Sequence, residues 1–172
     1  MSDCMPAHIA IGGQLAGADL PDLYQAILDD KARLDWDEEA MPALARFQEL
    51  ATDLKGEALR LFNSEAPFGE LEHIEAFCQK RRLTYVRHGD AKYEFDAEMA
   101  WWAPGLPRPI VVASLNSRDV PALPLDELDA ARARGSQAFE AWLAEHRPPE
   151  VPAFTVDHGR PAGCGAVHAK PV

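Results

Sequence analysis

The stretch His88-Gly-Asp-Ala-Lys-Tyr-Glu-Phe-Asp-Ala-Glu98 decides the predicted fold, because even positions are charged or titratable and odd positions are apolar or small. A period of two is typical of a β-strand with one solvated face and one buried face. The solvated face would carry a row of three carboxylates, Glu94, Asp96 and Glu98. The buried face would carry three apolar residues, Tyr93, Phe95 and Met99.

The elements around this strand are predicted as a hairpin followed by a meander. Leu83 to Arg87 is predicted as the preceding strand, and His88 to Ala91 as the turn between the two. The acidic strand would end at Trp101-Trp102, because Pro104-Gly105 must break it. The apolar, β-branched run from Ile110 to Leu115 predicts a further strand that pairs antiparallel with it.

Strands and helices alternate in the N-terminal half. Ala7 to Ile11 predicts a first strand that closes in a turn at Gly12-Gly13. Two helices, a strand and a third helix follow, near residues 19–30, 42–55, 57–62 and 70–82. A last helix from Asp126 to about His146, with Gly135 on its buried stripe, would be about 30 Å long.

These elements predict an α+β protein in two layers. Their order is β-α-α-β-α-β-β-β-α, which gives a mixed sheet of four to five strands with helices packed mainly on one face. Helical crossovers join the first two strands, so we expect those strands to be parallel. We expect a single domain over residues 1–146, and a Pro- and Gly-rich tail over 147–172 that is extended or mobile.

Composition indicates a soluble cytoplasmic protein. The 172 residues include 47% hydrophobic residues, which suits one globular domain. The formal charge of -11 repels nucleic acid and anionic membranes and attracts a basic partner. Three scattered cysteines make no disulfide framework, and the sequence shows neither a leader pattern nor a long apolar run. Nucleic acid and membranes are therefore not expected as partners.

Two acidic stretches indicate a protein-binding surface. Six acidic residues fall between Asp29 and Glu39, and exposed aromatic residues beside such charges are typical of interfaces. The candidate contact residues are Glu94, Asp96, Glu98 and Trp102 from the strand, and Asp35, Trp36, Asp37, Glu38 and Glu39 from the connection. The expected function is regulatory or inhibitory binding of a protein with a basic surface.

Three alternatives to partner binding stay open for the acidic strand: a solvated face, a metal site and mimicry of nucleic acid. It can be an ordinary solvated face, or it can hold a divalent metal through Glu94, Asp96 and His88 in a metal-dependent enzyme. Alternate residues of a strand are about 6.7 Å apart, which is wide for three ligands of one ion. The same spacing makes a single row too sparse to imitate the charge of duplex DNA. No cofactor is predicted, because the glycines at 12, 13 and 17 complete neither phosphate-binding fingerprint.

Two segments, Phe68 to Cys78 and Tyr85 to Met99, resemble a family of uncharacterised small bacterial proteins associated with phages, plasmids and other mobile elements. The resemblance implies no catalytic residues. It implies a regulatory or inhibitory role, because small acidic proteins of mobile elements often act by binding a host protein.

Overall fold

The computed structural model describes residues 3–37, 40–92, 96–115 and 120–159. Among these residues the chain forms an α+β structure with seven strands and five α-helices. The elements are β1 (Cys4–Ala16), the 3-10 helix η1 (Gly17–Asp19), α1 (Leu20–Asp29), α2 (Leu44–Thr52), β2 (Leu59–Pro67), α3 (Glu72–Arg81), β3 (Thr84–Gly89), β4 (Glu98–Trp102), β5 (Ile110–Leu115), β6 (Val120–Ala122), α4 (Leu125–Ala133), α5 (Ser136–Glu145) and β7 (Phe154–Asp157). The α+β class is confirmed, although at most five strands and four helices are predicted.

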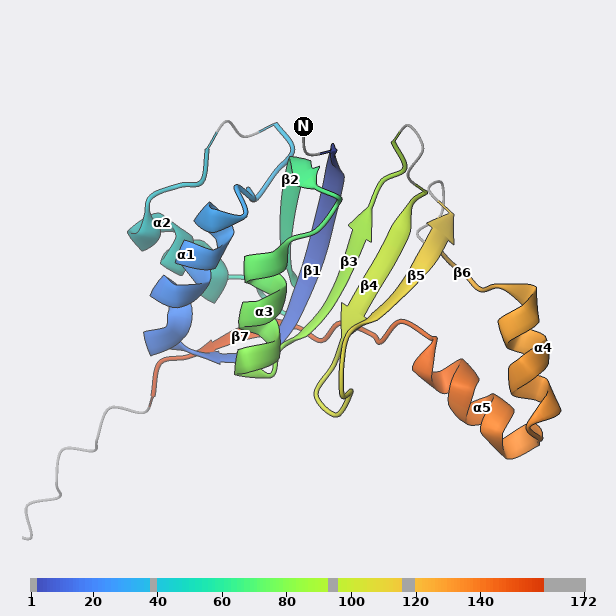
Figure 1. The fold of residues 1–172 in the computed structure, drawn as a ribbon. Helices are drawn as coiled ribbons and strands as arrows, with labels where there is room; N and C mark the ends of the chain where they lie inside the picture. The colour runs from blue at the N-terminus through green and yellow to red at the C-terminus, as the bar shows by residue number, and fades with distance from the viewer. Residues whose placement is uncertain (1–2, 38–39, 93–95, 116–119, 160–172) are drawn as a thin grey trace, which may run out of the picture.

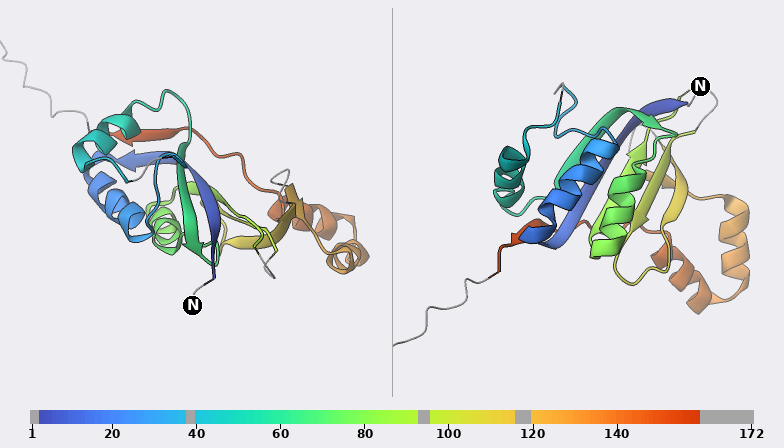
Figure 2. Two further views of the ribbon diagram at one scale, coloured as in Figure 1. Left: turned by 90° about the horizontal axis from the view of Figure 1, so that it is seen from above. Right: turned by 60° about the vertical axis from the view of Figure 1, so that its left-hand side comes forward.

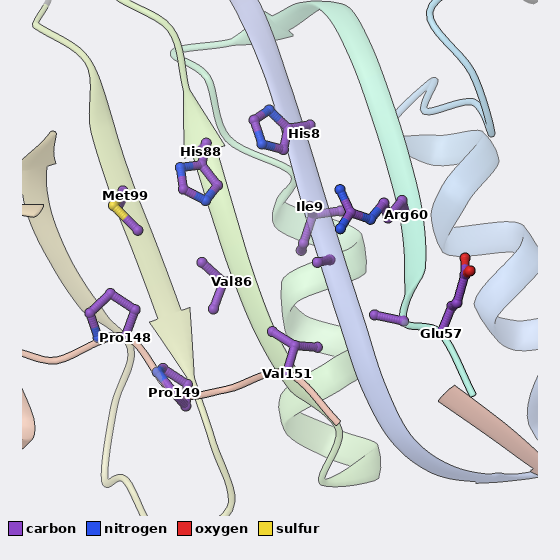
Figure 3. A pocket seen from close by; sticks show the side chains of 12 residues that line it. His8, Ile9, Glu57, Arg60, Val86, His88, Met99, Pro148, Pro149 and Val151 are labelled. Carbon is purple, nitrogen blue, oxygen red and sulfur yellow. The ribbon is translucent and has the colours of Figure 1, made fainter. Parts of the chain in front are cut away.

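All seven strands belong to one sheet, in the order β2-β1-β3-β4-β5-β6, with β7 beside β1. Every pair is antiparallel except β1 with β7. Helices α1 and α3 lie side by side on one face of the sheet (Figures 1 and 2). We call the opposite face the open face. It is crossed by an extended segment, residues 147–153, which we call the strap (Figures 2 and 3).

The prediction that the first two strands are parallel is wrong. β1 and β2 are antiparallel, with Ile9 opposite Leu61. One helix between two strands returns the chain to its starting end and makes the strands parallel. Here α1 runs back along β1, and residues 30–43 with α2 then carry the chain to the other end again (Figure 1). The chain therefore runs along the sheet twice between the two strands, once in each direction, and β2 begins beside the later part of β1.

Gly12 and Gly13 do not end the first strand, because β1 continues through them to Ala16. A Cβ on Gly12 would lie 1.8 Å from the carbonyl oxygen of Pro152. Gly13 has a φ of 119° and donates its N–H to Ala153 O at 3.1 Å. The two glycines let the strap pass against the strand, and β1 pairs with β7 from Gly13 onward.

The strap, residues 147–153, leads into β7, and the four residues of β7 belong to the sheet. Phe154 is buried in the main core, and its N–H donates to Glu57 O at 2.9 Å. The fold therefore continues past the expected boundary at residue 146, through β7. Residues 160–172 lie outside the described residues.

The last predicted helix is two helices, α4 and α5, because the chain breaks at Gly135. Gly135 has a φ of 100°, which a right-handed helix cannot contain. The break makes a helical hairpin in place of one long rod, and Ala131 is the buried residue of α4. Phe139 and Trp142 are half-buried, so the expected deep stripe does not form.

The apolar face of the third helix is confirmed by the structure. Ile74, Phe77 and Cys78 on α3 are all buried against the sheet. Asp30, the residue after α1, caps the N-terminus of α3. Its carboxylate accepts hydrogen bonds from the backbone N–H groups of His73 and Ile74 at 3.2 and 2.8 Å. A capping residue more than 40 positions away gives no local sequence signal.

Candidate binding surface on the open face

The predicted acidic row does not form on one solvated face. β4 begins only at Glu98, Asp96 is exposed and precedes it, and Glu94 lies outside the described residues with its neighbours Tyr93 and Phe95. His88 is not in a turn, because β3 extends through it to Gly89. The stretch that suggested one continuous strand therefore ends β3 and begins β4.

Glu98 lies on the helix-covered face, in an ion-pair network around Arg87. Arg87 is 2% exposed, and its guanidinium contacts Glu98 Oε1 and Glu75 Oε1, each at 2.6 Å. It also donates to the backbone carbonyl of Gly69. The Tyr85 hydroxyl donates to the second oxygen of Glu75 at 3.0 Å. Because its charge is matched here by Arg87, Glu98 is not a member of an exposed acidic surface.

Burial and neighbouring charges together shift the pKa values of the residues in this network. Burial raises the pKa of Glu75, while the adjacent Arg87 opposes that shift. Burial and the charge of Glu75 likewise raise the pKa of Tyr85. For Arg87, burial lowers the pKa, but the neighbouring carboxylates more than reverse it. The guanidinium therefore stays charged, and these contacts fix α3 to the sheet.

Trp102, predicted as an exposed aromatic contact, is buried. It is 8% exposed, belongs to the main core, and donates its indole N–H to Leu106 O at 3.0 Å. Both faces of β4 are covered at this point, since Met99 and Trp101 are buried on the other side. A period-two pattern does not reveal that both faces of a strand are packed.

The predicted acidic connection lies at the β2 edge of the sheet. Arg33 bridges Phe62 on β2, and Asp35, Trp36 and Asp37 follow as exposed residues. The Trp36 side chain is 44% exposed, and Glu38 and Glu39 lie outside the described residues. β1 and β3 separate β2 from β4, a distance of about 14 Å across the sheet. The structure therefore does not place the two predicted acidic stretches together.

Four rings form a continuous row that begins at Trp36 and runs over the open face. Trp36 and Phe62 have ring centroids 4.9 Å apart, Phe62 and His8 6.1 Å, and His8 and His88 4.6 Å with the last pair stacked. We call these four residues the ring row. The register explains it, because Phe62, His8 and His88 are directly opposite one another on β2, β1 and β3. Opposite residues of antiparallel strands point to the same face.

A hollow of about 710 Å³ lies beside the ring row on the open face (Figure 3). The next register step places Arg60, Ala10 and Val86 opposite one another, and the small Ala10 leaves space between its neighbours. Met99 and the strap residues Pro148, Pro149 and Val151 complete the apolar wall. We call this feature the hollow.

The predicted metal set is not assembled among the described residues. That part of the chain contains no group of three or more His, Cys, Asp or Glu residues placed to hold an ion. His88 lies on the open face, whereas Glu98 points to the helix-covered face. Glu94 lies outside the described residues, so the full set Glu94, Asp96 and His88 stays a prediction.

Sequence reasoning missed four residues of this surface: His8, Phe62, His88 as a strand residue, and Arg60. Alternation along β1 and β2 could have assigned His8, Phe62 and Arg60 to one face, since the burial of these two strands alternates. It could not have done so for His88, because nearly every residue of β3 is buried. The pairing register that brings them together comes from long-range contacts, which a single sequence does not display.

Comparisons with protein-family models, curated proteins and solved structures found no match to this chain. The resemblance to proteins of mobile elements therefore stays a prediction. None of the helices in the described ranges combines the length and apolarity needed to cross a bilayer.

Proposed function

We propose that this protein acts by binding a protein partner non-covalently, through the ring row and the acidic residues Asp35 and Asp37 beside Trp36. The observation that carries the proposal is the continuity of the ring row across three strands of the open face. Aromatic side chains at the centre of an interface contribute large contact area at low entropic cost.

Charge supports a basic partner at this surface. The chain carries a formal charge of -11, and such a field speeds the approach of a basic surface. Asp35 and Asp37 flank the most exposed ring, so a Lys or Arg side chain of the partner would meet a π face and two carboxylates together. The role that follows is regulatory or inhibitory occupation of the partner's surface.

The test compares matched variants in capture from the native host, followed by calorimetry with the purified partner. Trp36→Ala should weaken binding about 30-fold, the effect of losing an interface hot spot. The control Trp142→Ala removes a half-buried tryptophan from α5 and should change affinity by less than about twofold. Circular dichroism confirms that both variants are folded.

The charges are tested in the same assay. Asp35→Asn with Asp37→Asn should slow association and reduce its salt dependence, whereas Asp126→Asn with Asp129→Asn on the exposed side of α4 should not. The proposal fails if no protein is captured, or if the captured partner binds Trp36→Ala and the Asp35/Asp37 variant as tightly as the unmodified chain.

A further inference from the structure

We propose a second site beside the first: the hollow binds a small organic monocarboxylate with an apolar tail. The proposal rests mainly on Arg60 and Ala10, neither of which belongs to the ring row, although His8 and His88 of the ring row also line the hollow. It therefore goes beyond the proposed partner binding and can fail independently of it.

Arg60 supplies the charge for a carboxylate head. It is exposed on β2 directly opposite Ala10, and Figure 3 shows its guanidinium reaching over β1 toward the histidine pair. Within the described ranges of the chain no carboxylate lies within ion-pair distance of it. Glu57, which also lines the hollow, points to the other side of the β2 ribbon (Figure 3).

The apolar wall supplies the place for the tail. Val86 and Met99 form the floor from β3 and β4, and Val151 packs against them from the strap. The volume of about 710 Å³ falls within the range of about 300 to 1,000 Å³ that is common for small-ligand sites. A ligand whose carboxylate binds Arg60 can therefore place a hydrocarbon chain against the apolar wall. Removing this apolar surface from water is favourable.

The chemistry selects a monoanion over other ligands. A guanidinium presents paired N–H donors that match the two oxygens of a carboxylate, and His8 and His88 add ring nitrogens at the same end of the hollow. An ammonium head would be repelled by Arg60. A multiply charged phosphate would be repelled most by the overall charge of -11.

The experiment titrates octanoate, octanamide, octylammonium and inorganic phosphate into the full chain and follows backbone amide shifts by NMR. Octanoate should bind at least about tenfold more tightly than octanamide, because the charged hydrogen bonds to Arg60 are lost in the amide. The shifted amides should cluster at Ala10, Val86 and Val151. Octylammonium should bind more weakly than octanoate, although the net charge alone favours it.

Two variants locate the site and one controls for them. Arg60→Gln should weaken octanoate about tenfold and remove the preference over octanamide. Ala10→Leu fills the hollow and should weaken both probes. Arg46→Gln, which changes an exposed arginine on α2, should leave both affinities unchanged. Equal affinity for octanoate and octanamide, tighter binding of octylammonium or phosphate, unchanged binding in Arg60→Gln, or no shifts at all would each overturn the proposal.

Discussion

The two faces of the sheet differ in how they accommodate charge, as a comparison of two arginines shows. Arg87 on β3 lies on the helix-covered face, is 2% exposed and is held by Glu75 and Glu98. Arg60 on β2 lies on the open face and is exposed. On the covered face the charge of Arg87 helps to hold α3 against the sheet, whereas on the open face the charge of Arg60 is accessible to solvent.

The difference follows from what packs on each face. α1, α3 and the main core cover one side, where an unmatched charge would be costly. The strap covers only part of the other side, next to Val86, Met99 and Trp101. The rest of the open face keeps half-buried rings and an exposed arginine at the surface, and both proposed binding sites lie on this side of the sheet.

The sharpest test of this comparison replaces each arginine by methionine. Arg87→Met leaves two carboxylates near each other without their cation and should lower the free energy of unfolding by about 3–5 kcal/mol. Arg60→Met should change it by no more than about 0.5 kcal/mol, because the side chain is exposed. Urea denaturation of both variants measures the difference. An equal loss of unfolding free energy in the two variants would show that Arg87 is no more important for stability than Arg60.

The second test asks whether the packing of the strap against β1 requires a glycine at position 12. Gly12→Ala forces a Cβ against Pro152 O, since the two atoms would be 1.8 Å apart. We expect a loss of about 3 kcal/mol, near the upper end of ordinary overpacking. Gly17→Ala is the matched control, because its Cβ would meet His158 Nδ1 at 3.0 Å and that side chain can move.

Thermal unfolding of both glycine variants provides the measurement. The expected loss in Gly12→Ala includes exposure of the apolar cluster under the strap, so a dye that binds apolar surface should bind this variant more strongly. If Gly17→Ala destabilises the protein as much as Gly12→Ala, the close contact with Pro152 is not what requires glycine in β1.

The smallest effect is a pH dependence at the end of the helix-covered face. The hydrogen bond and charge of Asp30, with smaller contributions from Asp29 and Glu72, raise the pKa of His73 above its usual 6.5. A raised folded-state pKa gives stability that is complete below pH 6.5 and is lost as the pH rises through the folded pKa. His73 is more than half exposed, so the effect should stay below about 1 kcal/mol.

His73→Gln tests this prediction. The variant should be less stable than the unmodified chain at pH 5.5, and the difference in melting temperature should shrink as the pH is raised toward 9. Salt should reduce the difference at low pH, because the pair is exposed to solvent. A difference that stays constant over this range would show that the His73–Asp30 contact contributes without its charge.

Local patterns predicted several elements correctly. The spacing of Ile74, Phe77 and Cys78 gave the buried face of α3, and the β-branched run at 110–115 gave β5. These signals depend on side chains that are neighbours along one element. The same reasoning missed the break at Gly135, because an apolar stripe can continue across a turn between two helices.

The site was predicted less well, for a different reason. Trp36, a predicted contact residue, is exposed, but the predictions for Glu98 and Trp102 place these two residues in the wrong environment. Charge and aromaticity mark residues that can bind a partner, yet burial depends on what packs against the strand. For Glu98 the deciding neighbour is Arg87, eleven positions earlier on the adjacent strand.

Composition and local periodicity are enough to predict the α+β class, the charge and most of the strand and helix positions of this chain. Three features become visible only in the folded protein: β1 and β2 are antiparallel, Glu98 is paired with Arg87, and the four rings of the ring row lie side by side. Those arrangements depend on strand order and register, which contacts distant in the chain select together. The alternating stretch from His88 to Glu98 thus contains the end of β3 and the start of β4, and the packed neighbours decide which of its charges reach solvent.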